Sequence, residues 1–447
     1  MNAYIRYFLI FALLALVGGV VFGTLAAFQF LYPGMLEFIP FYKLRPLHVS
    51  LVVAWIFLAS TGCIFYFVSE FKNAKRFSLP LTAAYLTLFV SGGLLILVSF
   101  IYGKFGGREY WEAHPVFSLV VLLAWLVFMI NFFKTAFSIR STWPVYLWMW
   151  ATGVTFFLVT FIEAHAWLLP SFNNNVVRDI TVQWKAYGAL VGSWNMLVYG
   201  IAVFLVEKIT GNIQTAKSGL SFSMYFLGFF NLLFGWAHHI YIVPCSPVIR
   251  VISYAVSMTE LIILFKIIYN ARQSVINARP YMRHTIFAFL LSSDLWVLLN
   301  LTLALLISIP AVNLYTHGTH VTVAHAMGST IGINTFILFS ALAYVTSRLT
   351  KIAAFTRAFK LMRSGIWILN ISLLAFWLFL IAAGFRKGYL IIENNISHHE
   401  AMSAIENYLL GFSISGIGIL AGILLIAAPL FIHLLTTVKT DENQDVL

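Results

Sequence analysis

The 447-residue sequence has few charged residues and few cysteines. Asp, Glu, Lys and Arg make up 9% of it, against 61% hydrophobic residues, whereas a soluble domain carries roughly 25% charged residues. This composition excludes a soluble globular protein and predicts a polytopic membrane protein whose core consists of packed transmembrane helices. The two cysteines, Cys63 and Cys245, exclude a disulfide framework. Because no CxxCH motif occurs, we expect no c-type haem attached to this chain.

Acidic residues are scarcer than basic ones, and the formal net charge is +12. In a membrane protein such an excess comes from basic loops that face the cytoplasm, so it does not predict a nucleic-acid partner. The most basic loops follow even-numbered predicted spans, and they read FKNAKRF, EKITGNIQTAK, NARQSVINARPYMRH and SRLTKIAAFTRAFK. We therefore predict a multi-pass protein of the bacterial inner membrane with both termini in the cytoplasm.

Apolar runs of about 20 residues, the length that spans a bilayer, recur along the chain. They predict twelve transmembrane helices at 8–32, 46–69, 78–103, 115–138, 145–169, 184–207, 218–243, 250–271, 283–309, 319–347, 362–385 and 406–436. These spans account for nearly the whole chain, so 1–447 is predicted to be a single all-α transmembrane domain. We expect no cleavable signal peptide, because the first apolar run is long enough to span.

Two adjacent histidines, His238 and His239, interrupt the apolar stretch LFGWAHHIYIV. Ionisable residues inside a membrane are costly and usually functional. Neighbouring residues on a helix point about 100° apart, so both rings can bind one metal. The structural alternative, a hydrogen-bonded pair inside the bundle, suits a single histidine better than a tandem pair. The motif therefore predicts a metal site.

Further potential ligands share the predicted outer leaflet with this pair. His48 is placed at the outer end of the second span, and His325 and Met327 near the outer end of the tenth. His325 and Met327 point about 200° apart on a helix, so one helix could ligate two haems, with His48 opposite Met327 in a His/Met haem. Interface capping by His48 and core packing by Met327 are the alternatives. The pattern predicts a haem or metal layer toward the periplasmic side.

Other polar residues in apolar surroundings are weaker candidates. Glu260, in SMTELIIL, is an intramembrane carboxylate that could ligate the metal, relay protons or make a structural hydrogen bond. Glu163 and His165, in FIEAHAW, form an outer polar cluster or a proton path. His317 and His320 lie in or beside an outer loop and are expected to form hydrogen bonds rather than bind metal.

The chain resembles the catalytic large subunit of cytochrome-c-dependent nitric oxide reductase, in the haem–copper oxidase superfamily. The segments that carry the resemblance are LYTHGTHVTVAHAMG, the tandem histidines, RPLHVSLVVAW, SMTELI, GGREYWE and VEKITG. It extends over essentially the whole chain and includes the twelve-helix plan. It implies reduction of two NO to N2O and water, with electrons from a membrane-anchored c-type cytochrome subunit.

The resemblance also implies roles for individual residues. The haem-related residues are His48 as an axial ligand of a low-spin haem b, His325 as the proximal ligand of a high-spin haem b, and Arg45 beside a haem propionate. The metal-related residues are His238 and His239 as ligands of a non-haem iron (or copper), Glu260 beside that iron for structure or proton delivery, and Glu109 in a calcium site.

Two helices depart from the family pattern. The tenth carries His325-Ala-Met327 where the family has His-x-His, so the low-spin haem would be His/Met or take its second ligand from elsewhere. In the sixth, Tyr187 and Val191 occupy the positions of a histidine and a glutamate that bind the non-haem iron, and a further glutamate position is Asn195. His238, His239 and Glu260 then remain for that metal, with Tyr187 as a further candidate in the catalytic set.

Three other functions stay open at this point. The altered sixth helix could support NO dismutation or oxygen reduction on the same scaffold. The chain could be a haem-bearing paralogue that has lost its non-haem metal. It could also be a transporter whose histidines bind no haem, which the one-leaflet arrangement of ligands argues against.

Overall fold

The computed structural model describes residues 1–71, 74–212, 214–244, 246–262, 284–349 and 352–442. Within these residues the chain is built of helices and contains no β-strand, only an isolated bridge between Arg108 and Trp111. Eleven helices in the described part are long and apolar enough to cross a membrane. The predicted all-α, multi-pass membrane fold is thereby confirmed.

The spans follow the predicted order. Those without an internal change of helix type are α1 (Asn2–Gln29), α2 (Phe41–Ser69), α3 (Leu79–Ile101), α4 (Pro115–Ala136), α7 (Val176–Thr210), α11 (Thr285–Ser308), α15 (Ile352–Ile392) and α17 (Glu406–Glu442). The composite ones are α5 (Val145–Glu163) with η1 (Ala166–Leu168), α8 (Gly219–Phe234) with η3 (Gly235–Ile240), and α13 (His320–Met327) with η4 (Gly328–Thr335) and α14 (Phe336–Leu349). The expected span 250–271 begins in α9 (Pro247–Met258) and continues past Ile262 outside the described residues.

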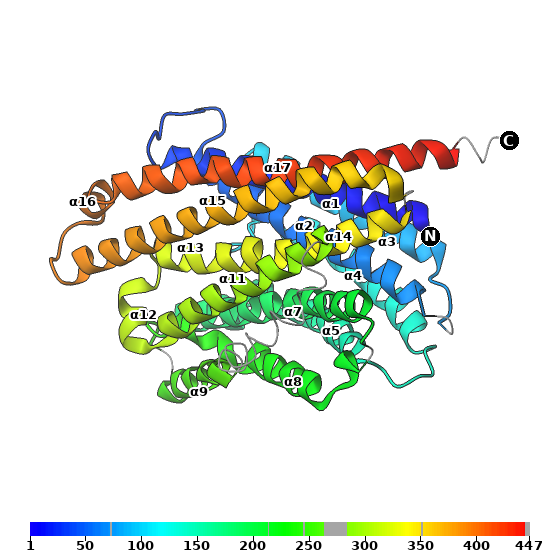
Figure 1. Cartoon of the computed structure of the whole chain (residues 1–447). Coiled ribbons are helices and arrows are strands. Elements are labelled where there is room, and N and C mark those ends of the chain that lie inside the picture. The colour runs from blue at the N-terminus through cyan, green and yellow to red at the C-terminus, as the bar shows by residue number, and fades with distance from the viewer. Residues whose placement is uncertain (72–73, 213, 245, 263–283, 350–351, 443–447) are drawn as a thin grey trace.

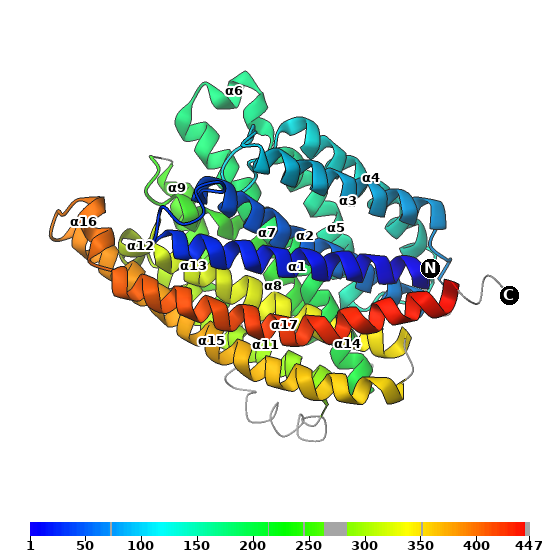
Figure 2. The same cartoon turned by 90° about the horizontal axis from the view of Figure 1, so that it is seen from above.

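The helices run lengthwise through one bundle, and both termini lie at the same end of it (Figures 1 and 2). We name this the inner end. At the opposite, outer end lie the short helices α6 (Pro170–Asn173), α12 (Pro310–Thr316) and α16 (His398–Ser403). The long helices α15 and α17 lie side by side in both views. Termini at one end require an even number of crossings, as the sequence predicts.

The pair α5 and α7 illustrates how the bundle packs. Small residues let these helices approach closely, as is usual in membranes. A Cβ at Gly153 would lie 2.7 Å from the Ser193 carbonyl oxygen, and one at Gly200 would lie 2.6 Å from Trp150 Nε1. The buried Trp150 indole donates to the Leu197 carbonyl at 3.1 Å, which satisfies its polar atom without water. This contact fixes α7, which carries Tyr187, against its neighbour.

The tenth span is not a continuous α-helix. Directly after Met327 the chain forms the π-helical turn η4, where a continuous helix over 319–347 was expected. The Thr335 hydroxyl accepts a hydrogen bond from Trp55 Nε1 at 3.0 Å and donates to the Thr330 carbonyl at 2.8 Å. This joins the π turn to α2, the helix of His48. Such turns are frequent at functional sites.

Glycine is required where η4 meets α11. A Cβ at Gly332 would lie 2.5 Å from the indole carbons of Trp296. We expect Gly332→Ala to lower the free energy of unfolding by about 1–3 kcal/mol through overpacking. Gly93→Ala on α3, where a Cβ would meet nothing within 4 Å, is the matched control and should cause no loss. Thermal unfolding of the detergent-purified variants measures both. Equal unfolding temperatures would contradict this description of η4.

Candidate functional site

The tandem histidines lie on a 3₁₀ helix rather than on the α-helix that the sequence predicted. Helix α8 ends at Phe234, and η3 carries His238 and His239, with ring centroids 4.1 Å apart and planes inclined by 43°. Two neighbours hold this segment. Ser253 donates to the Gly235 carbonyl at 3.0 Å, and Asn313 Nδ2 donates to the His238 carbonyl at 3.3 Å. The two rings are therefore adjacent and their backbone is anchored.

His325 and His317 belong to the same neighbourhood. Both interact electrostatically with His238 and with His239. The chain reverses between α12 and α13 at Gly318, whose φ of +69° is a conformation that glycine adopts without strain. This turn places His317 at the end of α12 and starts the helix of His325. The structure thus brings together three predicted site residues and adds His317, which was expected only to form loop hydrogen bonds.

Unpartnered nitrogen atoms mark this cluster. Nδ1 of His238 and Nδ1 of His325 are buried and form no hydrogen bond of ordinary geometry among the described residues, although the two rings interact with the backbone of Gly235 and of Asn300. A buried polar atom without a partner costs about 1–3 kcal/mol. Such atoms in a native structure call for a further ligand or an unseen partner.

Trp184 of α7 packs directly on this cluster. Its ring stacks on His239 with a centroid distance of 5.3 Å and an interplanar angle of 14°. Tyr110 also contacts Trp184, with its ring 5.8 Å away in an edge-to-face arrangement. The sequence analysis did not identify Trp184 as a site residue, since an aromatic residue in an apolar helix gives no signal of a specific stacking partner. The structure shows that it fixes the plane of His239.

Tyr187 lies one turn after Trp184 on the same face of α7. Its hydroxyl is buried and interacts with the Gln183 side chain, and its ring stands 6.3 Å from that of Tyr110. The family's glutamate positions on this helix are Val191 and Asn195, and Asn195 accepts a hydrogen bond from Asn334 Nδ2 of η4 at 3.1 Å. The sixth span thus presents one buried hydroxyl, and its Asn195 forms an amide pair with Asn334.

No group of three or more His, Cys, Asp or Glu side chains in the described part of the chain is close enough to hold a metal ion. Glu260 accordingly does not complete such a group with His238 and His239. It interacts instead with Tyr199, fifteen residues after Trp184, which is about 22 Å along an α-helix. The metal site with Glu260 as a ligand stays a prediction, with two adjacent imidazoles as its observed part.

His48 has the environment of an oriented ligand. Its Nδ1 donates to the Gly19 carbonyl of α1 at 2.7 Å, which leaves Nε2 free. Gly23 makes room for the ring, since a Cβ there would lie 2.5 Å from Nδ1. Metal-binding histidines usually donate their second N–H in this way, which fixes tautomer and ring orientation. Met327, the last residue of α13, is half-buried, and its role as a ligand stays a prediction.

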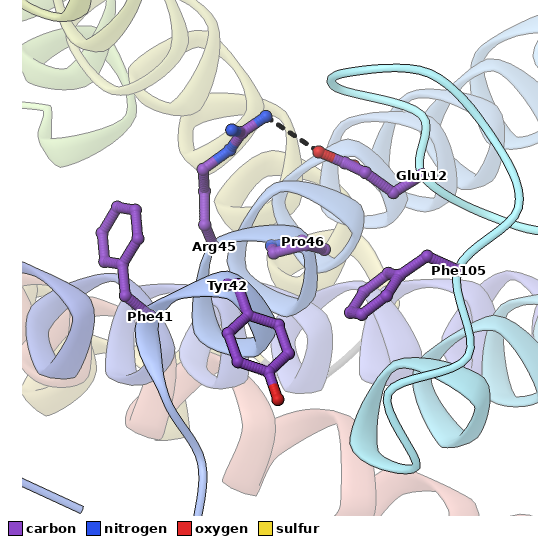
Figure 3. A pocket seen from close by; sticks show the side chains of 6 residues that line it. All are labelled: Phe41, Tyr42, Arg45, Pro46, Phe105 and Glu112. Atoms are coloured by element: carbon purple, nitrogen blue, oxygen red, sulfur yellow. Dashed lines mark hydrogen bonds and ion pairs between the residues drawn. The ribbon is translucent and has the colours of Figure 1, made fainter. Parts of the chain in front are cut away.

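Arg45 joins the two acidic residues of the GGREYWE loop at the outer end, and Figure 3 shows its contact with Glu112. Its Nη2 lies 2.8 Å from Glu112 Oε1 and 3.4 Å from Glu109 Oε1, and its guanidinium lies 5.4 Å from the centre of the Tyr110 ring. Together with four other residues, Arg45 and Glu112 line a pocket of about 290 Å³; the others are Phe41, Tyr42, Pro46 and Phe105. Glu109 was the acidic residue predicted to belong to this site. Glu112 was not predicted, although it lies closer to Arg45.

The GGREYWE loop contains a buried carboxyl group and a strained backbone position. Burial raises the pKa of the Glu112 carboxyl, although the neighbouring Arg45 charge lowers it. Its second oxygen, Oε2, is buried without a hydrogen-bond partner among the described residues. Tyr110 has a φ of +67°, a left-handed conformation that costs a bulky residue energy and concentrates at functional sites. This unpartnered Glu112 oxygen could coordinate a cation that has a free coordination position.

Comparison with known proteins gives one family match and several distant relatives. Residues 3–419 match the family described as cytochrome c and quinol oxidase polypeptide I. The chain is 24% identical to a nitric oxide reductase subunit of Stutzerimonas stutzeri over 412 residues, which cover 86% of this chain and 84% of that protein. It is 25% identical to cytochrome c oxidase subunit 1 of Rhodobacter capsulatus over 388 residues, which cover 80% of this chain and 69% of that protein.

Two further comparisons agree with these. A cbb3-type cytochrome c oxidase subunit of Stutzerimonas stutzeri is 23% identical over 366 residues, which cover 76% of this chain and 74% of that protein. A solved haem–copper terminal oxidase dimer matches the structure with a TM-score of 0.72 at 16% identity, covering 97% of this chain and 84% of the solved one. The predicted resemblance and the predicted bundle type are confirmed.

The Arg45 contacts lead to a prediction on stability. We expect Arg45→Gln to lower the free energy of unfolding by about 1–3 kcal/mol, because it removes the partner of a largely buried carboxylate. Glu109→Gln, which removes the longer and more exposed contact, should cost less than about 1 kcal/mol. In a Glu112→Gln background the Arg45→Gln substitution should cost much less than in the parent protein. Equal costs in the two backgrounds, measured by chemical unfolding, would refute the pairing.

Proposed function

The chain belongs to the cytochrome c and quinol oxidase polypeptide I family, and from this premise we propose that it is the catalytic subunit of a nitric oxide reductase. As a family member it is a multi-pass membrane oxidoreductase. The proposed reaction converts two NO, two electrons and two protons into N2O and water. The observation that carries the proposal is the juxtaposition of His325 with the adjacent rings of His238 and His239. The alignment also covers a larger share of the reductase subunit, 84%, than of the two oxidase subunits, 69% and 74%.

The residues fit the haems that this family implies. His48 presents a free Nε2 on an imidazole already oriented by a backbone carbonyl, which suits an axial ligand of a low-spin haem b. Met327 is the proposed second ligand, and such His/Met ligation raises a haem's reduction potential relative to bis-His. His325 is the proposed ligand of a high-spin haem b, and Arg45 the proposed contact of a propionate.

The fit to a non-haem iron or copper is partial. His238 and His239 supply two imidazoles, and the buried hydroxyl of Tyr187 is the proposed third group, because it lies on the face of α7 that contacts His239 through Trp184. Glu260 is the proposed proton carrier beside Tyr199, and its role as a ligand of this metal also stays a prediction. Calcium is proposed at Glu109, where Glu112 offers a second carboxylate.

When bound, these redox groups would supply electron transfer and the coordination of NO. The chain's own residues hold and orient them. Trp184 keeps the His239 ring in one plane, and the Gly19 carbonyl selects the His48 tautomer. Protons would enter from the outer end, where Glu163 pairs with Lys185. Electrons would come from a membrane-anchored c-type cytochrome subunit, since the chain has no CxxCH motif of its own. The outer end would face the periplasm of a bacterial inner membrane.

Oxygen reduction is the second candidate function. It is favoured by the similar identity of the two cytochrome c oxidase subunits, 25% and 23%. Dismutation of NO is a variant on the same scaffold. The products separate these functions, because they are N2O, water, or N2 with O2.

Anaerobic turnover of NO tests the proposal. The purified complex is given a reduced donor, and N2O, N2 and O2 are followed together by mass spectrometry. We expect one N2O for every two NO consumed. Release of N2 with O2 would replace the proposal by dismutation. Binding of NO without any product would show a haem protein that has lost the chemistry.

The Trp184 stack gives a second prediction. Trp184→Leu should lower the affinity for the non-haem metal by about tenfold or more, the usual effect of removing a group that orients a ligand. Trp184→Phe, which keeps a ring against His239, should retain more metal. Metal per chain after dialysis against a chelator, with haem content as the internal reference, measures this. Trp148→Leu, at an exposed tryptophan, is the matched control, and the idea fails if all three variants retain metal equally.

A further inference from the structure

We propose that a basic pocket at the inner end of the bundle binds the phosphate headgroup of an anionic phospholipid. The pocket has a volume of about 700 Å³ and is lined by Lys75, Lys134, Phe137, Ser138 and Arg140. It lies between the connection of α2 to α3 and the connection of α4 to α5, at the end where both termini lie (Figures 1 and 2). It is remote from the histidine cluster and does not depend on the proposed function.

The walls of this pocket are held in place by hydrogen bonds. The Lys75 backbone N–H donates to the Ser138 hydroxyl at 2.7 Å, and that hydroxyl donates to the Thr135 carbonyl at 2.6 Å. Asn131 of α4, which is fully buried, pairs with the Ser78 backbone in both directions, at 3.0 and 3.2 Å. The two connections are therefore tied to each other, and little ordering is needed when a ligand binds.

The pocket gathers positive charge with no acid to balance it. Lys75, Lys134 and Arg140 are exposed, and none of them forms an ion pair within the described part of the chain. The sequence has no Asp or Glu between Glu70 and Glu109, or between Glu112 and Glu163. Lys134 complements the negative end of the α4 dipole, but Lys75 and Arg140 have no such structural role. An anion would relieve the repulsion among the three.

A row of aromatic rings beside the pocket indicates a lipid as the source of that anion. Phe133 stacks on Phe137, Phe137 stacks on Trp143, and Trp143 contacts Trp148, with centroid distances of 5.2, 5.8 and 5.3 Å. Phe137 is 72% exposed and Trp148 45% exposed. Aromatic residues of this kind lie at headgroup depth in membranes, and basic pockets on the cytoplasmic side bind anionic headgroups. A free phosphate has no apolar part that could pack against these rings.

Lipid binding to the full-length protein tests the proposal. Native mass spectrometry in detergent compares phosphatidylglycerol with phosphatidylcholine of the same acyl chains. The pocket variant is Lys75→Gln/Lys134→Gln/Arg140→Gln. The control variant, Lys217→Gln/Arg357→Gln/Lys360→Gln, removes three exposed charges near the inner ends of η2 (Thr215–Lys217) and α15. The single substitution Arg140→Gln keeps the test valid if the triple variant does not fold.

We expect the parent protein to bind phosphatidylglycerol about tenfold or more tightly than phosphatidylcholine, since basic residues near the membrane surface attract anionic headgroups. The pocket variant should lose this preference, the control should keep it, and Arg140→Gln should weaken it severalfold. Equal losses in the pocket and control variants would overturn the proposal, and so would the absence of a preference in the parent. Displacement of phosphatidylglycerol by millimolar inorganic phosphate would assign the pocket to free phosphate.

Discussion

The cost of placing imidazole rings inside a helix bundle is the constraint on which this structure depends. Water is scarce there, so each ring nitrogen needs a partner from the protein or from a ligand. His48 meets the requirement at one nitrogen through the Gly19 carbonyl. His238 and His325 do not meet it at Nδ1 within the described residues. The gathering of the His238, His239 and His325 rings in one place is the physical basis for regarding them as ligands.

The rest of the bundle serves to hold those rings in place. Close approach at small residues fixes α5 against α7, and α7 in turn presents Trp184 to His239. The Trp55–Thr335 hydrogen bond ties the helix of His48 to the π turn that follows Met327. Positioning therefore comes from helices that are far apart in the sequence. A change in any of these contacts would alter the site without touching a ligand.

Composition and hydropathy predicted much of the fold, because an apolar run of membrane-spanning length leaves a helix as the one solution for its backbone. The tandem His238–His239 pair was visible for a similar reason, since a polar pair in an apolar run is rare. The helix type was not predictable. The 3₁₀ form of η3 and the π form of η4 depend on contacts with Asn313, Ser253 and Trp55 from other helices.

The same limit explains which site residues were missed. Trp184 is an ordinary aromatic residue of an apolar helix until its stacking on His239 is seen. Glu112 lies in the same loop as Glu109, the residue that was predicted to belong to the site. Only the structure shows which of the two carboxylates lies nearer to Arg45. The proximity of Glu260, which follows α9, to Tyr199 of α7 likewise depends on tertiary packing. The sequence of a uniformly apolar helix does not indicate how the helix is rotated about its axis or how deep its residues lie in the membrane.

The central claim is that His325 binds one haem beside a non-haem metal held by His238 and His239, with His48 at a second haem. The most direct measurement is the haem and non-haem metal content of the purified protein, from optical spectra of the oxidised and reduced forms and from elemental analysis. The account predicts two b-type haems and one non-haem metal ion per chain, with one haem low-spin and one high-spin. A colourless protein, or one with a single haem and no further metal, would contradict it.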